Sequence, residues 1–198
     1  MKRGTEIKAF ILLFVSVVSL VILSGCVVQS INPFYAADAV IDLPEVSGTW
    51  VLKKSSVDEG LNREWTFSAD KIALPDAKGG SFVLSSRFFR IGDMLFLDAI
   101  ADSPPDGLSF WWVLHVTPVH TVSRVIADNQ QMKIIPLNAS WMEAAVKQKT
   151  VVLSAVRHPE QNSYLFTATS ADWAEFLRKY GKDQNVFPEK DAFVFARP

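Results

Sequence analysis

The pattern of apolar and polar residues predicts a series of short strands that follows an apolar N-terminal segment. Residues 9–23 are almost continuously apolar. Residues 64–68 alternate between polar and apolar side chains, which is typical of a strand with one buried face. Farther along, Phe82, Leu84 and Phe88 share one face of another expected strand. Both segments therefore predict strands that turn one face toward a core.

The remaining strand patterns follow one another at short intervals. Gly92-Asp93 is a two-residue turn, so the strands at 81–91 and 94–100 are expected to form a hairpin. Turn residues separate the other segments. Further strands are expected at 48–54, 110–117, 119–127, 132–137, 151–156, 163–168 and 192–196.

Two segments near the C-terminus have helical spacing instead. Asn138 is the expected N-cap of a helix at 139–149, and Thr169 or Ser170 is the expected N-cap of a second helix. The second helix carries an apolar stripe and ends at a glycine in the C′ position: Trp173, Phe176, Leu177, Tyr180 and Gly181.

Many short strands in meander order, with few helices, predict a mainly β fold. We expect an antiparallel meander that closes into a barrel or forms a strongly curved sheet, with the two α-helices covering its open end or an edge. The predicted organisation is a signal peptide at 1–25, an anchor and tether at 26–45, and a single β-rich domain at 46–198.

The N-terminal segment has the layout of a secretory signal peptide. Basic residues precede the apolar run, and small residues follow it. A retained membrane span is the alternative, because the run approaches the roughly twenty residues that a span needs if it is counted as far as Val28. Cys26, the only cysteine of the chain, favours the signal peptide, since an exported free thiol would be reactive or would link two chains.

The sequence Leu23-Ser24-Gly25-Cys26 resembles the lipobox of bacterial lipoproteins. The resemblance implies cleavage before Cys26, a diacylglycerol on its sulfur and an acyl chain on the new amino terminus. Several acyl chains hold a protein stably at a membrane, whereas a single chain holds it marginally. The next residue is Val27 and not Asp, which by the same resemblance favours the outer membrane over the inner membrane.

Composition and charge narrow the classes of partner. Removing the signal leaves about 170 residues, the size of one domain. The signal carries three basic residues and one acidic residue, so its removal changes the net charge from −1 to about −3. A mildly acidic domain has no electrostatic reason to bind nucleic acid. The expected partners are the membrane, through Cys26, and either an apolar small molecule or an envelope protein.

Gly48-Thr49-Trp50 at the start of the first strand, the meander, and the late helix and strand are similar to lipocalins. In that family the Trp of a Gly-x-Trp sequence closes the barrel floor, and an Arg from near the C-terminus packs on it. The resemblance implies these roles for Trp50 and Arg197. The chain departs from the family because it lacks a Thr-Asp-Tyr sequence and inserts the helix at 139–149.

A second resemblance covers most of the mature chain. Asn32-Pro33-x-Tyr35, Gly48-Thr49-Trp50, Glu64-Trp65-Thr66-Phe67, Leu95-Phe96-Leu97-Asp98 and the helix around Phe176-Leu177 look like a group of uncharacterised bacterial lipoproteins. That group implies no activity.

The residues that could carry chemistry form no recognisable catalytic or metal pattern. The histidines are His115, His120 and His158, and the first two, five residues apart, have neither strand nor helix spacing for a zinc site. Serines are plentiful, but the chain has no Gly-x-Ser-x-Gly sequence and no phosphate loop. Asp98 and Asp102, with Glu64 as a third carboxylate, could serve as acid and base only if the fold brought them together. We therefore expect no catalytic residues, no metal, no cofactor and no enzyme activity.

Aromatic residues are abundant in this chain, and they are more informative about function than the polar residues. They are either core residues, since Phe and Trp dominate protein interiors, or the lining of a barrel that admits an apolar ligand. The candidate ligand-binding residues are Trp50, Trp65, Phe82, Trp111 and Trp112. A carrier predicts a hollow interior lined by Trp50, Trp65 and Phe82, and a protein-interaction module predicts a filled interior and an apolar outer patch. A hydrolase would need Ser, His and Asp together in a cleft.

Overall fold

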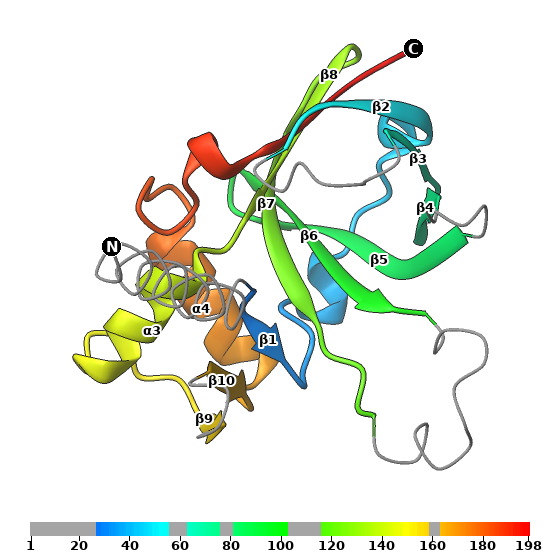
Figure 1. Ribbon diagram of the computed structural model, residues 1–198. Coiled ribbons are helices and arrows are strands. Elements are labelled where there is room, and N and C mark those ends of the chain that lie inside the picture. The colour runs from blue at the N-terminus through cyan, green and yellow to red at the C-terminus, as the bar shows by residue number, and fades with distance from the viewer. Residues whose placement is uncertain (1–26, 56–62, 76–80, 103–115, 159–162) are drawn as a thin grey trace, which may run out of the picture.

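The structure is a computed structural model that describes residues 27–55, 63–75, 81–102, 116–158 and 163–198 (Figure 1). It is mainly β, as the sequence predicts. Eight antiparallel strands close into a barrel, in which each strand pairs with its neighbour in the chain and the last strand lies between β8 and β2. These strands are β2 (Gly48–Lys54), β3 (Glu64–Phe67), β4 (Lys71–Pro75), β5 (Ser81–Ile91), β6 (Met94–Ala101), β7 (Thr121–Ala127), β8 (Gln131–Pro136) and β11 (Phe193–Ala196).

The observed strands confirm most of the strands that the sequence predicts. The hairpin of β5 and β6 turns at Gly92-Asp93, where Gly92 has a φ of +62° that suits a residue without a side chain. β4 is a strand that the sequence pattern does not single out. Of the strand expected at 110–117, residues 110–115 lie outside the described residues, and Val116 and Thr117 are not in a strand.

Side chains alternate between the inside and the outside of the barrel wall. The inward-facing residues form one apolar cluster, in which Trp50, Phe67 and Phe195 are almost completely buried. Other buried members of this cluster come from nearly every strand: Leu52, Trp65, Ile72, Phe88, Leu97, Val125, Met132 and Ile134. The barrel interior is thus one core of the protein.

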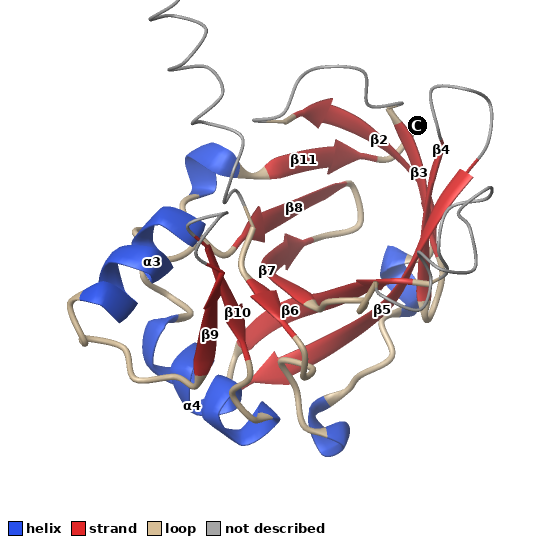
Figure 2. Ribbon diagram, turned by 60° about the horizontal axis from the view of Figure 1, so that its bottom comes forward, coloured by secondary structure: helices blue, strands red, loops and turns tan. Residues whose placement is uncertain are grey.

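A second core lies on the outer wall of β5 to β8, under the helices α3 (Ala139–Lys147) and α4 (Ser170–Tyr180). The strands here are apolar on both faces: Phe88 faces inward, while Phe89 and Phe96 face the helices. The expectation that the helices cover an open end or an edge is therefore wrong, and Figure 2 shows both helices along one side of the barrel.

The predicted helix caps are confirmed, and one glycine has a different role. The Asn138 side chain accepts a hydrogen bond from the Trp141 amide, and Thr169 and Asp172 form a reciprocal capping box. Gly181 ends α4 in a right-handed conformation, with φ of −62°, and not in the expected left-handed C′ conformation. A Cβ there would lie 2.6 to 2.8 Å from Leu177, Met94 and Phe96, so close packing requires the glycine.

A small three-stranded sheet lies beside the barrel, next to the helices (Figures 1 and 2). The short β1 (Gln29–Ser30) pairs in parallel with β10 (Ser163–Phe166), and β10 pairs antiparallel with β9 (Ala155–His158). The strand expected at 151–156 thus begins later, at Ala155. β1 is a strand that the sequence pattern does not predict.

The residues before the barrel lie against it; within this predicted tether, the sequence also favours packing of Phe34 and Tyr35 on the domain, and the structure confirms this. Phe34 is fully buried in the outer core, and Val40 forms a bridge to Phe89. Short 3-10 helices, η1 (Ala37–Ala39) and η2 (Pro44–Val46), follow, and a third, η3 (Glu189–Asp191), precedes β11. Residues from Phe34 to Val46 therefore pack together with the barrel domain.

Candidate functional site

One end of the barrel, which we call the floor, is closed by Trp50 and Arg197. The Arg197 guanidinium lies 4.1 Å from the centre of the Trp50 ring. Arg197 donates hydrogen bonds to the carbonyls of Ser47 (3.0 Å) and Glu45 (2.6 Å), and the Trp50 indole N–H donates to the Val46 carbonyl (2.7 Å). The contact of Arg197 with Trp50 that the resemblance to lipocalins implies is confirmed.

The segment before β2 completes the floor. Val46 belongs to the barrel core, and Ile41 and Leu43 pack against it. The amide of Ile41 donates to the Phe88 carbonyl at 2.9 Å, which fixes this segment across the strand ends. The floor is thus closed by apolar side chains and by the arginine that holds their backbone.

Aromatic rings fill the interior next to the floor. Trp65 is the register partner of Trp50 on the neighbouring strand. Its ring centre lies 5.0 Å from that of Phe195, 6.1 Å from that of Phe193 and 6.4 Å from that of Phe67. Ring contacts at these distances belong to a packed core. The predicted ligand residues Trp50 and Trp65 therefore lie together, within packed aromatic side chains.

At the opposite end of the barrel, which we call the mouth, the described inward-facing side chains are less buried. Phe82 lies near the start of β5, pairs with Leu74 of β4, and is 40% exposed. Leu84 and Ala101, which face inward like Phe82, are only partly buried. The structure thus places Phe82 at the other end of the barrel from Trp50. The two remaining predicted residues, Trp111 and Trp112, lie outside the described residues.

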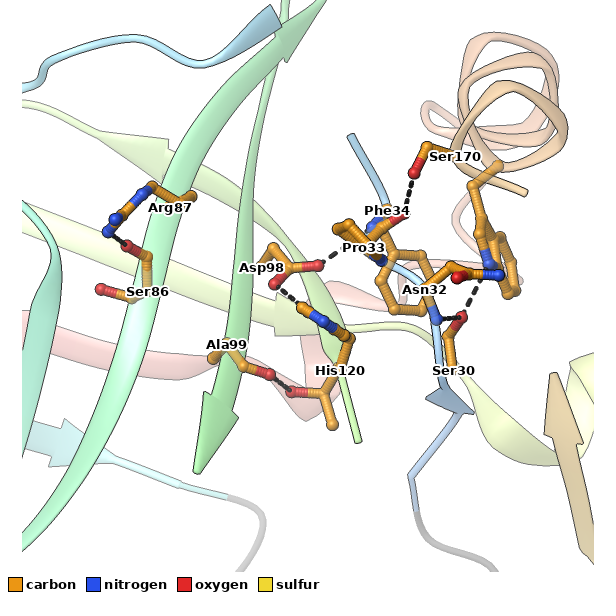
Figure 3. Close-up of polar contacts among 12 residues, drawn as sticks. Ser30, Asn32, Pro33, Phe34, Ser86, Arg87, Asp98, Ala99, His120 and Ser170 are labelled. Atoms are coloured by element: carbon orange, nitrogen blue, oxygen red, sulfur yellow. Dashed lines mark hydrogen bonds and ion pairs between the residues drawn. The ribbon is translucent and has the colours of Figure 1, made fainter. Parts of the chain in front are cut away.

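A polar cluster fixes the N-terminal segment to the outer wall of the barrel (Figure 3). Asp98 is buried on β6, where one carboxylate oxygen accepts the Phe34 amide at 3.0 Å. The other oxygen lies 2.7 Å from Nδ1 of His120. Both partners come from other segments, so Asp98 joins the N-terminal segment, β6 and the start of β7.

Ser30 extends this cluster toward α4. Its backbone exchanges two hydrogen bonds with that of His120, at 3.0 and 2.8 Å. Its buried hydroxyl oxygen accepts from the Trp173 indole N–H (3.1 Å) and from the Asn32 amide (3.2 Å). Ser170 on α4 donates to the Pro33 carbonyl at 2.8 Å. The buried polar groups therefore satisfy one another.

The cluster brings Ser30, His120 and Asp98 near one another, but its hydrogen bonds have a structural function. The Ser30 hydroxyl has no exposed surface and accepts hydrogen bonds from the Trp173 indole and the Asn32 backbone amide, and among the described residues no hydrogen bond joins it to the His120 ring. Asp98 and Asp102 also have separate partners, since Asp102 binds Lys71 and Ser85 at the surface. The fold therefore does not bring these two carboxylates together as an acid–base pair.

Tyr35 lies next to this cluster, and the charge of Asp98 affects the pKa of its hydroxyl. Burial raises the pKa of the Tyr35 hydroxyl above 10.0, the Asp98 charge raises it further, and the Arg87 charge opposes both effects. Sequence reasoning missed the cluster because its members lie far apart in the chain. The available signal was Asp98 itself, a single charge inside the apolar segment 94–100, since buried carboxylates are almost always paired.

Hollows that are lined by described residues include three that lie outside the barrel. The largest of these, of about 420 Å³, lies between η1, the β5–β6 turn and α4, and its charged residues are Asp38, Arg90 and Arg178. A second, of about 150 Å³, lies beside α4 and Val152. A third, of about 30 Å³, lies between α3 and β10, next to Val27.

The described part of the chain holds neither a metal-binding cluster nor a membrane-spanning helix. Within it, no three side chains of His, Cys, Asp or Glu come close enough together to hold a metal ion. Its helices are all too short or too polar to cross a membrane. His115 lies outside the described residues.

No protein-family model, no curated protein and no solved structure matches this chain.

Proposed function

We propose that this chain is a bacterial lipoprotein whose barrel domain is a non-enzymatic binding module. The basic start, the apolar run and the Leu23-Ser24-Gly25-Cys26 sequence support lipidation at Cys26. The mature protein then begins at the modified cysteine. The acyl chains hold it at a membrane of the cell envelope, and Val27 in the next position favours the outer membrane.

The difference between the two ends of the barrel carries the binding proposal. Inward-facing residues are buried near the floor, whereas Phe82, Leu84 and Ala101 keep exposed surface at the mouth. An apolar ligand that covers these residues gains the free energy of removing their surface from water. We place the ligand site at the mouth, around Phe82, because packed rings fill the space around Trp50 and Trp65.

Phe82 has a matched control in Ile126. Ile126 is 39% exposed, about as much as Phe82, but it lies on the outer face of β7, opposite to the inward-facing Val125. The experiment uses the mature chain with Cys26→Ser, which keeps every described residue, and titrates it with a fluorescent fatty-acid probe. We expect saturable binding that Phe82→Ala weakens at least fivefold and that Ile126→Ala leaves unchanged. A folded, monodisperse protein that does not bind, or equal effects of the two variants, would refute the site at the mouth.

The hollow of about 420 Å³ between η1, the β5–β6 turn and α4 favours a second candidate function, the binding of an envelope protein. Arg90 and Arg178 line this hollow together with Asp38, and among the described residues neither guanidinium has a hydrogen bond or an ion pair. Two free guanidinium groups suit a carboxylate-bearing segment of a partner. Chemical cross-linking in intact cells tests this candidate, because Arg90→Ala together with Arg178→Ala should remove the cross-linked product.

A further inference from the structure

The outer face of the small sheet is apolar and exposed. Burial alternates along the N-terminal segment, where Val27 and Ile31 are 51% and 41% exposed while Val28 and Ser30 are buried. Across the sheet, Gln29 pairs with Leu165, which pairs with Val156. Side chains of paired residues share a face. The face therefore carries the apolar residues Val27, Ile31, Leu165 and Val156 together with the polar Gln29 and Ser163, and Val156 is 61% exposed.

This face begins one residue after the proposed lipid anchor. The Cα atoms of Cys26 and Val27 are about 3.8 Å apart, as for any adjacent pair. Ile31 lies about 13 Å farther along the extended chain, and Val156 lies about 10 Å from Gln29 across two strand spacings. The whole face is therefore close to the point where the acyl chains would enter the bilayer.

The described residues pack against the domain from Val28 onward. Val28 is packed in the outer core, and Ser30 is hydrogen-bonded to His120 and Trp173. A domain joined in this way can stand upright on its anchor, with the face in water, or lie with the face on the bilayer. Only the second arrangement removes the exposed valine, isoleucine and leucine side chains from water. The anchor also keeps the face at a high local concentration at the surface, so a small contact area suffices.

We propose that the outer face of the β1–β10–β9 sheet lies on the membrane that holds Cys26, so that the anchor and the sheet fix the orientation of the barrel together. The inference rests on the proposed lipidation. With a net charge near −3, the mature chain has no excess of positive charge to draw it to anionic lipids, so the contact is apolar.

Single introduced cysteines can report where each surface lies. Cys26 is the only native cysteine, and its sulfur is blocked in the lipidated protein. Ile31→Cys and Val156→Cys probe the face, and Ile126→Cys is the control, because Ile126 is similarly exposed on the barrel wall. Each lipidated variant carries an environment-sensitive fluorophore on its new thiol. It is then reconstituted into vesicles of phosphatidylethanolamine and phosphatidylglycerol that contain a lipid with a quencher on its acyl chain.

We expect the labels at 31 and 156 to be quenched by the lipid at least twofold more than the label at 126, and to be protected from iodide in the water. Equal quenching at all three positions in a protein of verified lipid mass would overturn the membrane contact alone. Protection in native membranes but not in pure lipid vesicles would also overturn it, because a protein would then cover the face. A mass without lipid would overturn both this inference and the proposed anchor.

Discussion

Gly48 and Arg197 show how single residues close the barrel floor. Gly48 has a φ of +112°, a conformation that residues with a side chain rarely adopt. A Cβ at this position would lie 2.9 Å from a guanidinium nitrogen of Arg197. The glycine of Gly48-Thr49-Trp50 thus serves two purposes: it permits the backbone turn into β2, and it leaves room for the arginine that covers Trp50.

We predict that Arg197→Ala lowers the free energy of unfolding by about 1–3 kcal/mol, because it removes the contact with the Trp50 ring and two charge-assisted hydrogen bonds. Arg197→Lys should have a smaller effect, since lysine keeps the charge but cannot donate to both carbonyls with a planar fork. Urea unfolding followed by circular dichroism measures both changes. The control is Lys190→Ala, an exposed cation with no hydrogen bond or ion pair among the described residues. Equal stability of Arg197→Ala and the control would contradict the role of Arg197.

At the scale of elements, the N-terminal segment is held by the buried Asp98 and not by an extensive sheet. β1 has only two residues, and one of them, Ser30, is tied to His120 and Trp173. Asp98 provides the link to β6, since it accepts from Phe34 and contacts His120. The attachment of the segment therefore depends on a few buried polar contacts.

We predict that Asp98→Asn costs about 1–3 kcal/mol of stability, because asparagine offers one acceptor oxygen in place of two and so holds Phe34 and His120 less well. Hydrogen exchange at 28–35 should speed up more than exchange in β6 itself. Asp102→Asn is the matched control from the end of the same strand, where the carboxylate is exposed and binds Lys71. We expect a clearly smaller effect from the control, as for exposed ion pairs in general. Similar losses in both variants would show that Asp98 has no special role.

The sequence predicts most of the barrel because each strand carries its own local pattern. The alternation around Trp65 and the turn at Gly92-Asp93 depend only on neighbouring residues, and both are confirmed. The contact of Arg197 with Trp50 was predicted from a resemblance and not from local physics.

What the sequence does not predict depends on distant partners. β1 is two residues long and exists because β10 and His120 pair with it, so no local alternation signals it. The helices lie on the outer wall because Phe89 and Phe96 are apolar on the face that an isolated barrel would expose to water. The cluster around Asp98 joins residues more than sixty positions apart, from Phe34 to Asp98. Such contacts follow from the fold and not from the pattern of any one segment.

At the scale of the whole molecule, several surface carboxylates tie stability to pH. A hydrogen bond from the Thr169 hydroxyl lowers the pKa of Asp172, and hydrogen bonds from Ser85 and then Lys71 lower the pKa of Asp102, both below the ordinary value of 3.8. At pH values between the folded and the unfolded pKa of these groups, the folded protein therefore binds fewer protons than the unfolded chain. The stability that these groups contribute is complete above their unfolded pKa and is lost as the pH falls through their folded pKa.

We predict that the free energy of unfolding falls as the pH is lowered from about 4. The lowered pKa values of Asp93, through Lys182, and of Glu189, through Lys133, act in the same direction. Asp172→Asn should reduce the slope below pH 4, because it removes one of the titrating groups. Urea unfolding at a series of pH values measures the curve. Stability that stays constant down to pH 3 would contradict the prediction.

The central claim is that a packed β domain begins directly at a lipidated cysteine. The most direct test is the intact mass of the protein from its native membrane, beside that of Cys26→Ser. We predict a wild-type chain that starts at Cys26 and carries the added mass of a diacylglycerol and an acyl chain, and a variant that lacks the added mass and is not cleaved at this site. A wild-type chain that retains residues 1–25, or that starts at Cys26 without lipid, would contradict the claim.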